Sequence, residues 1–221
     1  MPCEITQNIE WQISSELIPY QFAVDFMEAR VQAIHEGTAN EMVWLLQHPP
    51  IFTIGTSGNH SDILGAGDIE IAKTGRGGQV TYHGPGQRVI YLMLDLKRRS
   101  RDVRKFVCNV EKWVIASLAD LGVVGNIRDG RIGVWVDVPQ DNGAIREEKI
   151  AAIGLRIRRW VSFHGVSINV APDLEHFARI NPCGMSKDDY GVTSLEKLAK
   201  SSSINALDDA LKANFHTFLG T

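Results

Sequence analysis

The sequence predicts an α+β fold: a single domain over residues 1–221 with a mixed, largely antiparallel sheet flanked by helices. The chain has 221 residues, 44% of them hydrophobic, and no repeat or long linker divides it, so it can bury one sizeable core. Apolar residues recur at helical spacing in two long segments. Several strand-like runs follow one another without an intervening helix, which argues against an alternating, doubly wound sheet.

Three helices are expected. The first runs from about residue 19 to residue 33, and Pro19 is compatible with a first helical turn. In the other two, apolar residues return every three or four positions, which predicts one face packed on the core. These positions are Val103, Phe106, Val107, Val110, Trp113, Val114 and Leu118 in one segment, and Ile204, Leu207, Leu211, Phe215 and Phe218 in the other.

Seven strands are expected, because β-branched and aromatic residues gather in short runs bounded by Gly, Pro or Asn. They cover residues 41–47, 51–54, 79–82, 89–96, 132–138, 149–157 and 166–170. Between two of these runs, the acidic, glycine-containing stretch 139–148 is expected to form an exposed loop or hairpin tip.

Composition excludes several functional classes. No apolar run reaches the roughly 18 residues that a membrane span requires. The N-terminus also lacks the basic and apolar regions of a signal peptide, so a cytoplasmic location without a membrane partner is expected. Cys3, Cys108 and Cys183 are odd in number and widely spaced, which suits neither a disulfide framework nor a zinc module. Any cysteine chemistry is therefore expected to be thiol chemistry.

Positive charge is clustered although the formal net charge is −3. Residues 97–105 hold six cations in nine positions, and Arg156, Arg158 and Arg159 form a second cluster. Each cluster fits a solvated face or a docking surface for an acidic protein. Nucleic acid is not expected as a partner, because the pI near 6.2 is far from basic and no recognised nucleic-acid-binding motif accompanies the clusters.

The densest local signal is the stretch 75–87, in which five glycines surround a strand-like run and a histidine. Glycines allow sharp turns and close backbone approach to a ligand, so the stretch fits a binding loop or a turn-rich hairpin. It matches neither a P-loop nor a dinucleotide-binding motif. His83 fits a base, a substrate anchor or a structural histidine, and His164 is expected at a pocket edge. The other five histidines, including His48, carry no signal.

Cys183 follows Pro182 and precedes Gly184, a pattern typical of a turn that would present a thiol at a loop. A lone cysteine is usually a small buried hydrophobe, and Cys108 on the second predicted helix fits that role. A thiol needs a nearby cation or base to attack at neutral pH. Lys149, at the start of a predicted strand, is the candidate, although the sequence alone does not bring the two residues together.

Four motifs occur in the order found in the bacterial lipoyl(octanoyl) transferase family, which the chain resembles from residue 47 to residue 194. They are the stretch 76–87, the run Lys149-Ile150-Ala151-Ala152-Ile153-Gly154, the segment 164–169 and Pro182-Cys183-Gly184. That family belongs to the superfamily of biotin and lipoate protein ligases. The resemblance implies the catalytic-domain fold of that superfamily.

The resemblance also implies residue roles. Cys183 matches the family cysteine that forms an acyl thioester, and Lys149 matches the lysine that lowers its pKa and acts as general acid and base. Substrate binding is implied for Arg76, Gly77, Gly78, Gln79, Val80, Thr81, Tyr82 and His83, for Ala152, Ile153 and Gly154, and for Gly165, Val166 and Ser167.

The implied reaction transfers an octanoyl group from octanoyl-acyl carrier protein to the target lysine of lipoyl domains. Such domains occur in 2-oxoacid dehydrogenase E2 subunits and in the glycine cleavage H protein. Because one thioester replaces another, no ATP is needed, and no metal is implied. Acyl carrier proteins and lipoyl domains are typically acidic, so Arg98, Arg99, Arg101 and Arg158 become candidate docking residues.

Two alternatives remain open. An ATP-dependent lipoate or biotin ligase would share the fold and a lysine, but it would activate its acid as an adenylate and need no nucleophilic cysteine. A metal- or ligand-binding module would use Cys183, His164 and His176, although His176 and Cys183 lack a paired second cysteine.

Overall fold

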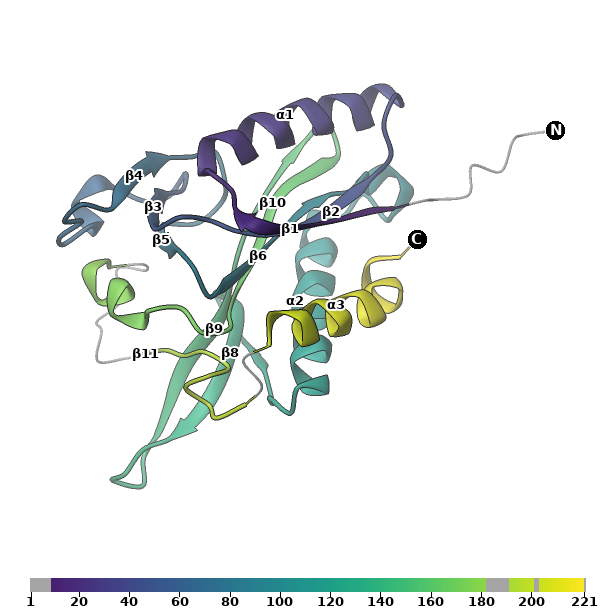
Figure 1. The fold of residues 1–221 in the computed structure, drawn as a ribbon. Coiled ribbons are helices and arrows are strands. Elements are labelled where there is room, and N and C mark those ends of the chain that lie inside the picture. Colours follow the sequence, from purple (N-terminus) through teal and green to yellow (C-terminus); the bar gives the residue numbers. More distant parts are fainter. Residues whose placement is uncertain (1–8, 182–190, 201–202, 221) are drawn as a thin grey trace.

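The computed structural model describes residues 9–181, 191–200 and 203–220. In this part of the chain, an eight-stranded sheet carries helices on both faces, and a three-stranded sheet lies beside it (Figure 1). The α+β fold with a mixed sheet flanked by helices is confirmed.

The helices are α1 (Tyr20–Glu36), α2 (Val103–Asp120) and α3 (Ile204–Leu219), with short 3₁₀ helices at His60–Asp62, Leu96–Arg98 and Leu174–Arg179. The strands are β1 (Glu10–Leu17), β2 (Met42–Gln47), β3 (Ile51–Ile54), β4 (Glu70–Lys73), β5 (Val80–His83), β6 (Gln87–Met93), β7 (Asn126–Arg128), β8 (Arg131–Pro139), β9 (Ile145–Arg158), β10 (Val161–Asn169) and β11 (Gly191–Val192).

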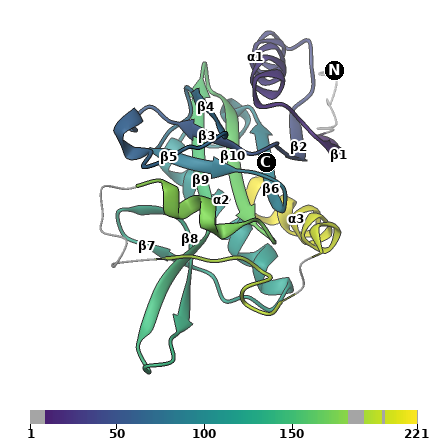
Figure 2. The ribbon, with the colours of Figure 1, turned by 60° about the vertical axis from the view of Figure 1, so that its left-hand side comes forward.

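The large sheet has the strand order β1-β2-β6-β10-β9-β8-β7, and β11 pairs with β9. Its central pairs are antiparallel, whereas β1 with β2 and β11 with β9 are parallel. In the small sheet β3 lies between β4 and β5. The hairpin of β8 and β9 projects from the body of the molecule in both views (Figure 2).

Both faces of the large sheet are buried, because alternate residues of its central strands enter two different cores. On β2, Val43 and Leu45 join a core formed with α2 and α3, whereas Met42, Trp44 and Leu46 join a core formed with α1. The same alternation continues on β6. Strands covered on both sides read as continuous apolar runs, which is why the sequence predicts them well.

The helices follow the predicted periodicity. On α2, Phe106, Val110, Trp113, Val114 and Leu118 are buried, and the Asp102 side chain caps the first turn by accepting from the Lys105 amide. Val103 is an exception, because it is 42% exposed. Among the described residues, no helix combines the length and apolar character that a membrane span requires.

The structure corrects two strand boundaries and adds strands, such as β1, that the sequence does not predict. β9 begins at Ile145, so only residues 140–144 of the expected loop 139–148 form the hairpin tip. β10 begins at Val161, five residues before the predicted strand, because His164 and its neighbours continue the pairing with β9. β1 was not predicted: it is an edge strand whose polar sequence lacks a continuous apolar run.

Candidate active site

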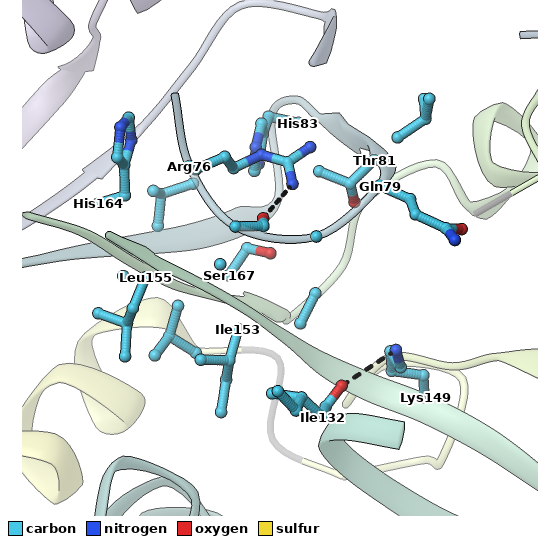
Figure 3. Close-up of a pocket in the computed structure, with 18 of the residues that line it drawn as sticks. Arg76, Gln79, Thr81, His83, Ile132, Lys149, Ile153, Leu155, His164 and Ser167 are labelled. Atoms are coloured by element: carbon cyan, nitrogen blue, oxygen red, sulfur yellow. Dashed lines mark hydrogen bonds between the residues drawn. The ribbon is translucent and has the colours of Figure 1, made fainter. Parts of the chain in front are cut away.

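A pocket of about 570 Å³ opens where β9 passes the glycine-rich loop that precedes β5. This volume lies in the roughly 300–1,000 Å³ range of small-molecule sites. The pocket walls come from that loop, from β5, β6, β9 and β10, from the start of α2 and from the turn between β7 and β8. In Figure 3, Arg76 and His83 lie on one side of β9, and Ile153 and Leu155 point to the other. The pocket therefore has two sides that meet at one strand.

The sequence-predicted binding segments meet at this pocket although they are far apart along the chain. Lys149 lines it, as do Arg76, Gly77, Gly78, Gln79, Val80, Thr81, His83, Ala152, Ile153, Gly154, Gly165, Val166 and Ser167. Tyr82 is different: its side chain is 2% exposed and packs against Phe52 and Phe177. Successive residues of a strand point to opposite faces, so Tyr82 belongs to the small sheet's core.

Lys149 lies beside a bulge in β9. Trp135 of β8 pairs with Lys149 and Val134 pairs with Ala151, so β9 carries one extra residue between them. Opposite the bulge, Gly133 has a φ of 127°, and a Cβ atom there would come within 2.7 Å of the Ala151 carbonyl oxygen. Bulges turn side chains out of the regular alternation, and this one directs Lys149 across Gly133 at the pocket mouth.

Two contacts fix the end of the Lys149 side chain. Its Nζ donates a hydrogen bond to the Ile132 carbonyl oxygen at 3.3 Å (Figure 3). The same Nζ lies 4.5 Å from the centroid of the Trp135 ring, and the Arg131 guanidinium carbon lies 4.7 Å from that ring. Trp135 is fully buried and its Nε1 donates to the Arg131 carbonyl oxygen. One rigid indole therefore supports two basic side chains, and each such contact contributes about 0.5–2 kcal/mol.

Cys183 lies outside the described residues, but the chain on each side of it is held in place. The Asn181 amide donates to the Asp62 carbonyl oxygen at 2.7 Å. After residue 190, Val192 pairs with Lys149 in β11, and the Thr193 amide donates to the Lys149 carbonyl oxygen at 3.0 Å. Val192, nine residues after Cys183 in the sequence, therefore lies directly beside Lys149.

Arg76 is buried with its guanidinium bonded to neutral groups. Its Nε and Nη2 donate to the Thr53 hydroxyl, Nη2 also donates to the Thr53 carbonyl oxygen, and Nη1 donates to the Gly77 carbonyl oxygen. Within the described ranges no carboxylate pairs with it, and burial lowers its pKa. These bonds hold the glycine-rich loop against β3, while the Gly77 amide ties the loop to β9 through Leu155.

Two of the glycines have packing reasons that do not involve a ligand. A Cβ on Gly154 would lie 3.1 Å from both Arg76 Cδ and the Gly77 carbonyl oxygen, so glycine lets the loop approach β9. A Cβ on Gly165 would lie 1.9 Å from the Ile90 carbonyl oxygen, which makes any side chain there incompatible with the neighbouring strand β6. Both positions shape the pocket by letting backbones approach closely.

A buried group of imidazoles and phenols forms the end of the pocket near Arg76. His48 Nδ1 donates to the Ile18 carbonyl oxygen, so its Nε2 is the acceptor for the Tyr91 hydroxyl at 2.7 Å. Burial lowers the pKa of His48 to about 4 and, with the nearby His48, the pKa of His83 to about 3. The ring of Tyr20 stacks on His83 at 6.2 Å. These histidines are therefore neutral hydrogen-bonding groups at physiological pH.

A chain of amides orients His83. Gln87 Nε2 donates to Asn169 Oδ1 at 2.9 Å, and Asn169 Nδ2 donates to the Thr193 carbonyl oxygen at 3.0 Å. Gln87 Oε1 must therefore accept from His83 Nδ1, which leaves the Nε2 lone pair of His83 available to the pocket. This series of hydrogen bonds ends at Thr193, whose backbone amide donates to the Lys149 carbonyl oxygen. It links the two ends of the pocket through buried, uncharged side chains.

His164, expected at a pocket edge, lines the pocket, and its side chain is buried. Its φ is 57°, an uncommon conformation for a residue with a side chain, and burial lowers its pKa to about 3. In the part of the chain that the structure describes, no three His, Cys, Asp or Glu side chains lie close enough to ligate one metal ion.

The other side of the pocket is apolar. It is lined by Val103 and Val107 of α2 together with Ile153, Leu155 and Ile157 of β9. The sequence assigned the two valines and Leu155 to strand or helix faces without a pocket role, because periodicity does not distinguish core from slot. His48, Tyr91 and Trp135 were likewise missed, since they meet Lys149 or His83 only through tertiary contacts.

Comparison with known proteins identifies the family. The model of the lipoyl protein ligase A/B catalytic domain matches residues 19–216. A protein named octanoyltransferase from Maricaulis maris (strain MCS10) is 56% identical over 204 residues, which cover 92% of this chain and 88% of that one. Another from Hyphomonas neptunium (strain ATCC 15444) is 53% identical over 207 residues, covering 94% of this chain and 88% of that one.

The fold also resembles that of solved lipoate protein ligases. A bipartite lipoate protein ligase from Thermoplasma acidophilum superposes with a TM-score of 0.69 at 16% identity, covering 96% of this chain and 84% of that one. The chain therefore belongs to the lipoyl protein ligase A/B catalytic-domain family, in its octanoyltransferase branch.

Proposed function

We propose that this acyltransferase takes an octanoyl group from octanoyl-acyl carrier protein, carries it as a thioester on Cys183 and delivers it to the target lysine of lipoyl domains. The observation that supports this most is the setting of Lys149. It lines the pocket together with the glycine-rich loop, and it pairs with Val192 of β11, nine residues after Cys183 in the sequence. Relatives that are 52–56% identical bear the name octanoyltransferase.

In the first half-reaction, the Cys183 thiolate attacks the thioester carbonyl of the donor. The carbon–sulfur bond to the pantetheine arm breaks, and Lys149, in its ammonium form, returns a proton to the departing thiolate. Backbone amides of the glycine-rich loop are suitable donors for the developing oxyanion. Because one thioester replaces another, this step needs no ATP and no metal.

In the second half-reaction, the neutral ε-amine of the acceptor lysine attacks the Cys183 thioester. Lys149, now in its amine form, accepts the proton that the attacking nitrogen loses, and the Cys183 thiolate departs. The product amide is more stable than the thioester, so the transfer runs downhill. The acceptors on this proposal are the lipoyl domains of 2-oxoacid dehydrogenase E2 subunits and the glycine cleavage H protein. A reactive thiol of this kind stays reduced in the cytoplasm, where we place the reaction.

The test is intact mass spectrometry of the wild type and of Cys183→Ala after mixing with octanoyl-acyl carrier protein, without acceptor or ATP. We expect an added octanoyl mass on the wild type alone, and a lipoyl domain should discharge it. Cys108→Ala is the matched control, because Cys108 lies on α2 and does not line the pocket. Transfer that survives in Cys183→Ala, or that requires ATP, would reject the thioester mechanism in favour of direct transfer or an adenylating ligase.

A further inference from the structure

The two basic segments of the sequence lie side by side in the fold, and most of their cations share one surface; Arg156 lies apart, over the ring of Phe163. The Leu96 amide donates to the Trp160 carbonyl oxygen at 2.7 Å, and Asp95 bridges to Val161, so the turn between β9 and β10 lies against the 3₁₀ helix before α2. The Arg101 amide also bonds the Leu96 carbonyl oxygen. We define the basic face as the exposed side chains of Lys97, Arg98, Arg101, Arg104, Lys105, Arg158 and Arg159.

Few acids compensate the basic face, although Asp102, which caps α2, lies within the same segment. Arg98 lies 4.0 Å from Asp95, and within the described residues no carboxylate forms an ion pair with the other six members. Arg99, which the sequence offered as a docking residue, is not part of this face. Its guanidinium forms a buried ion pair with Glu41 and also bonds the Leu219 carbonyl oxygen. The face is therefore positive although the whole chain is acidic.

Backbone strain and exposed apolar groups also gather here. Five non-glycine residues of the described chain have a positive φ, and three of them, Arg101, Arg159 and Trp160, lie on or beside the basic face. Arg159 and Trp160 form the two-residue turn that joins β9 to β10, where both positions favour glycine or asparagine. Each such residue costs about 1–3 kcal/mol, and such strain concentrates at functional sites. Trp160 is 40% exposed and Val103 42%. Exposed tryptophan and arginine are typical of protein interfaces.

The distance from the basic face to Lys149 indicates which kind of partner can dock on this face and still reach Lys149. Val103, at the edge of the basic face, and Val107 line the pocket, and one turn further along α2 the Glu111 carboxylate accepts from the Gly133 amide beside Lys149. Eight residues of helix span about 12 Å. A lysine side chain extends only about 6 Å, whereas a phosphopantetheine arm, comparable to five extended residues, reaches about 17 Å. An acceptor lysine cannot cover this distance, but a donor arm can.

We infer that the basic face docks the acidic carrier protein of the acyl donor, whose thioester arm enters the pocket between α2 and β9. This inference rests on the proposed function and assigns the donor and the acceptor to different surfaces. Trp160 and Val103 supply exposed apolar contacts beside the basic side chains. The acceptor domain is left to approach the pocket mouth formed by Ile132 and Lys149.

The experiment compares two donors, octanoyl-acyl carrier protein and octanoyl-N-acetylcysteamine, a small thioester without a protein. The test variant is Arg101→Glu/Arg104→Glu. Arg104 lies in the first turn of α2, where a carboxylate interacts favourably with the helix dipole. We therefore expect the substitution at this position to leave the stability of the folded protein unchanged. The control is Lys73→Glu/Lys212→Glu, an equal charge change at exposed positions on β4 and α3.

We expect the test variant to lower kcat/KM for the carrier-bound donor about 10-fold or more, mainly through KM and with a weaker salt dependence. Loading from N-acetylcysteamine thioester and discharge to a lipoyl domain should change less than about twofold. Equal losses with both donors, no loss with the carrier, or a loss confined to discharge would each overturn the inference. Binding of unacylated holo-carrier protein to the wild type and both variants tests the surface even if octanoyl loading fails, which would count against the proposed function alone.

Discussion

The Lys149 end of the pocket and the Arg76 end handle polar groups in opposite ways. Lys149 and Arg131 lie over the ring of Trp135 at the pocket mouth, near the surface. At the other end His48, His83 and His164 are buried and their pKa values fall to between about 3 and 4. One end can therefore exchange protons with a reacting group, whereas the other is suited to hold a substrate through neutral hydrogen bonds.

The difference between the two ends of the pocket is tested most strongly by substituting one residue at each end. Lys149→Met should lower the octanoyl transfer rate about 10²- to 10⁴-fold, because general acid–base catalysis contributes on that scale. His83→Gln, which keeps a hydrogen-bonding side chain, should leave kcat within about 10-fold and act mainly on KM. Single-turnover transfer to a lipoyl domain measures both, with Lys112→Met, exposed on α2, as the control. A larger kcat loss in His83→Gln than in Lys149→Met would reverse the assignment.

Acid should destabilise the buried end. Each of the three histidines has a folded-state pKa below its ordinary value of 6.5, so the unfolded chain binds protons that the folded chain does not. The stability that the three neutral histidines contribute is therefore fully present above about pH 6.5 and is lost as the pH falls to about 4 for His48 and to about 3 for His83 and His164. By pH 5 the loss is about 2 kcal/mol for each histidine.

Urea unfolding at pH 7 and pH 5 measures this loss. His83→Gln should reduce the acid-induced decrease in the free energy of unfolding, because one of the three groups no longer titrates. His60→Gln, at an exposed position, should leave it unchanged. An identical pH response in His83→Gln and the wild type would contradict neutral burial of His83.

The smallest effect is expected at the support of Lys149. Trp135→Phe offers a weaker ring and removes the bond from Nε1 to Arg131, so the transfer rate should fall about 3- to 10-fold. Its pH dependence should also shift, because the surroundings of the Lys149 amine change. Trp44→Phe is the matched control, since Trp44 is similarly buried and hydrogen-bonded but packs in the core against α1. Equal rates in Trp135→Phe and the wild type would exclude a positioning role.

The strands that the sequence predicts best are those with two buried faces. β2 and β6 are continuous apolar runs, and burial on both sides requires that pattern. β1 and β7 are edge strands with polar residues, and they form strands because they pair with β2 and β8. The hairpin tip is shorter than expected because residues 145–148, despite their charge, pair with β8.

The sequence alone predicted the α+β class and the faces of α2 and α3, because periodicity is a local property, and its resemblance to a known family implied the segments that line the pocket. Only the tertiary structure joined residues 97–105 to residues 156–159, turned Arg99 inward to Glu41, and placed Trp135 under Lys149. It also decided that His48, which carried no sequence signal, contacts His83 and Tyr91. These contacts depend on strand order, the bulge in β9 and burial, which no local pattern of residues encodes.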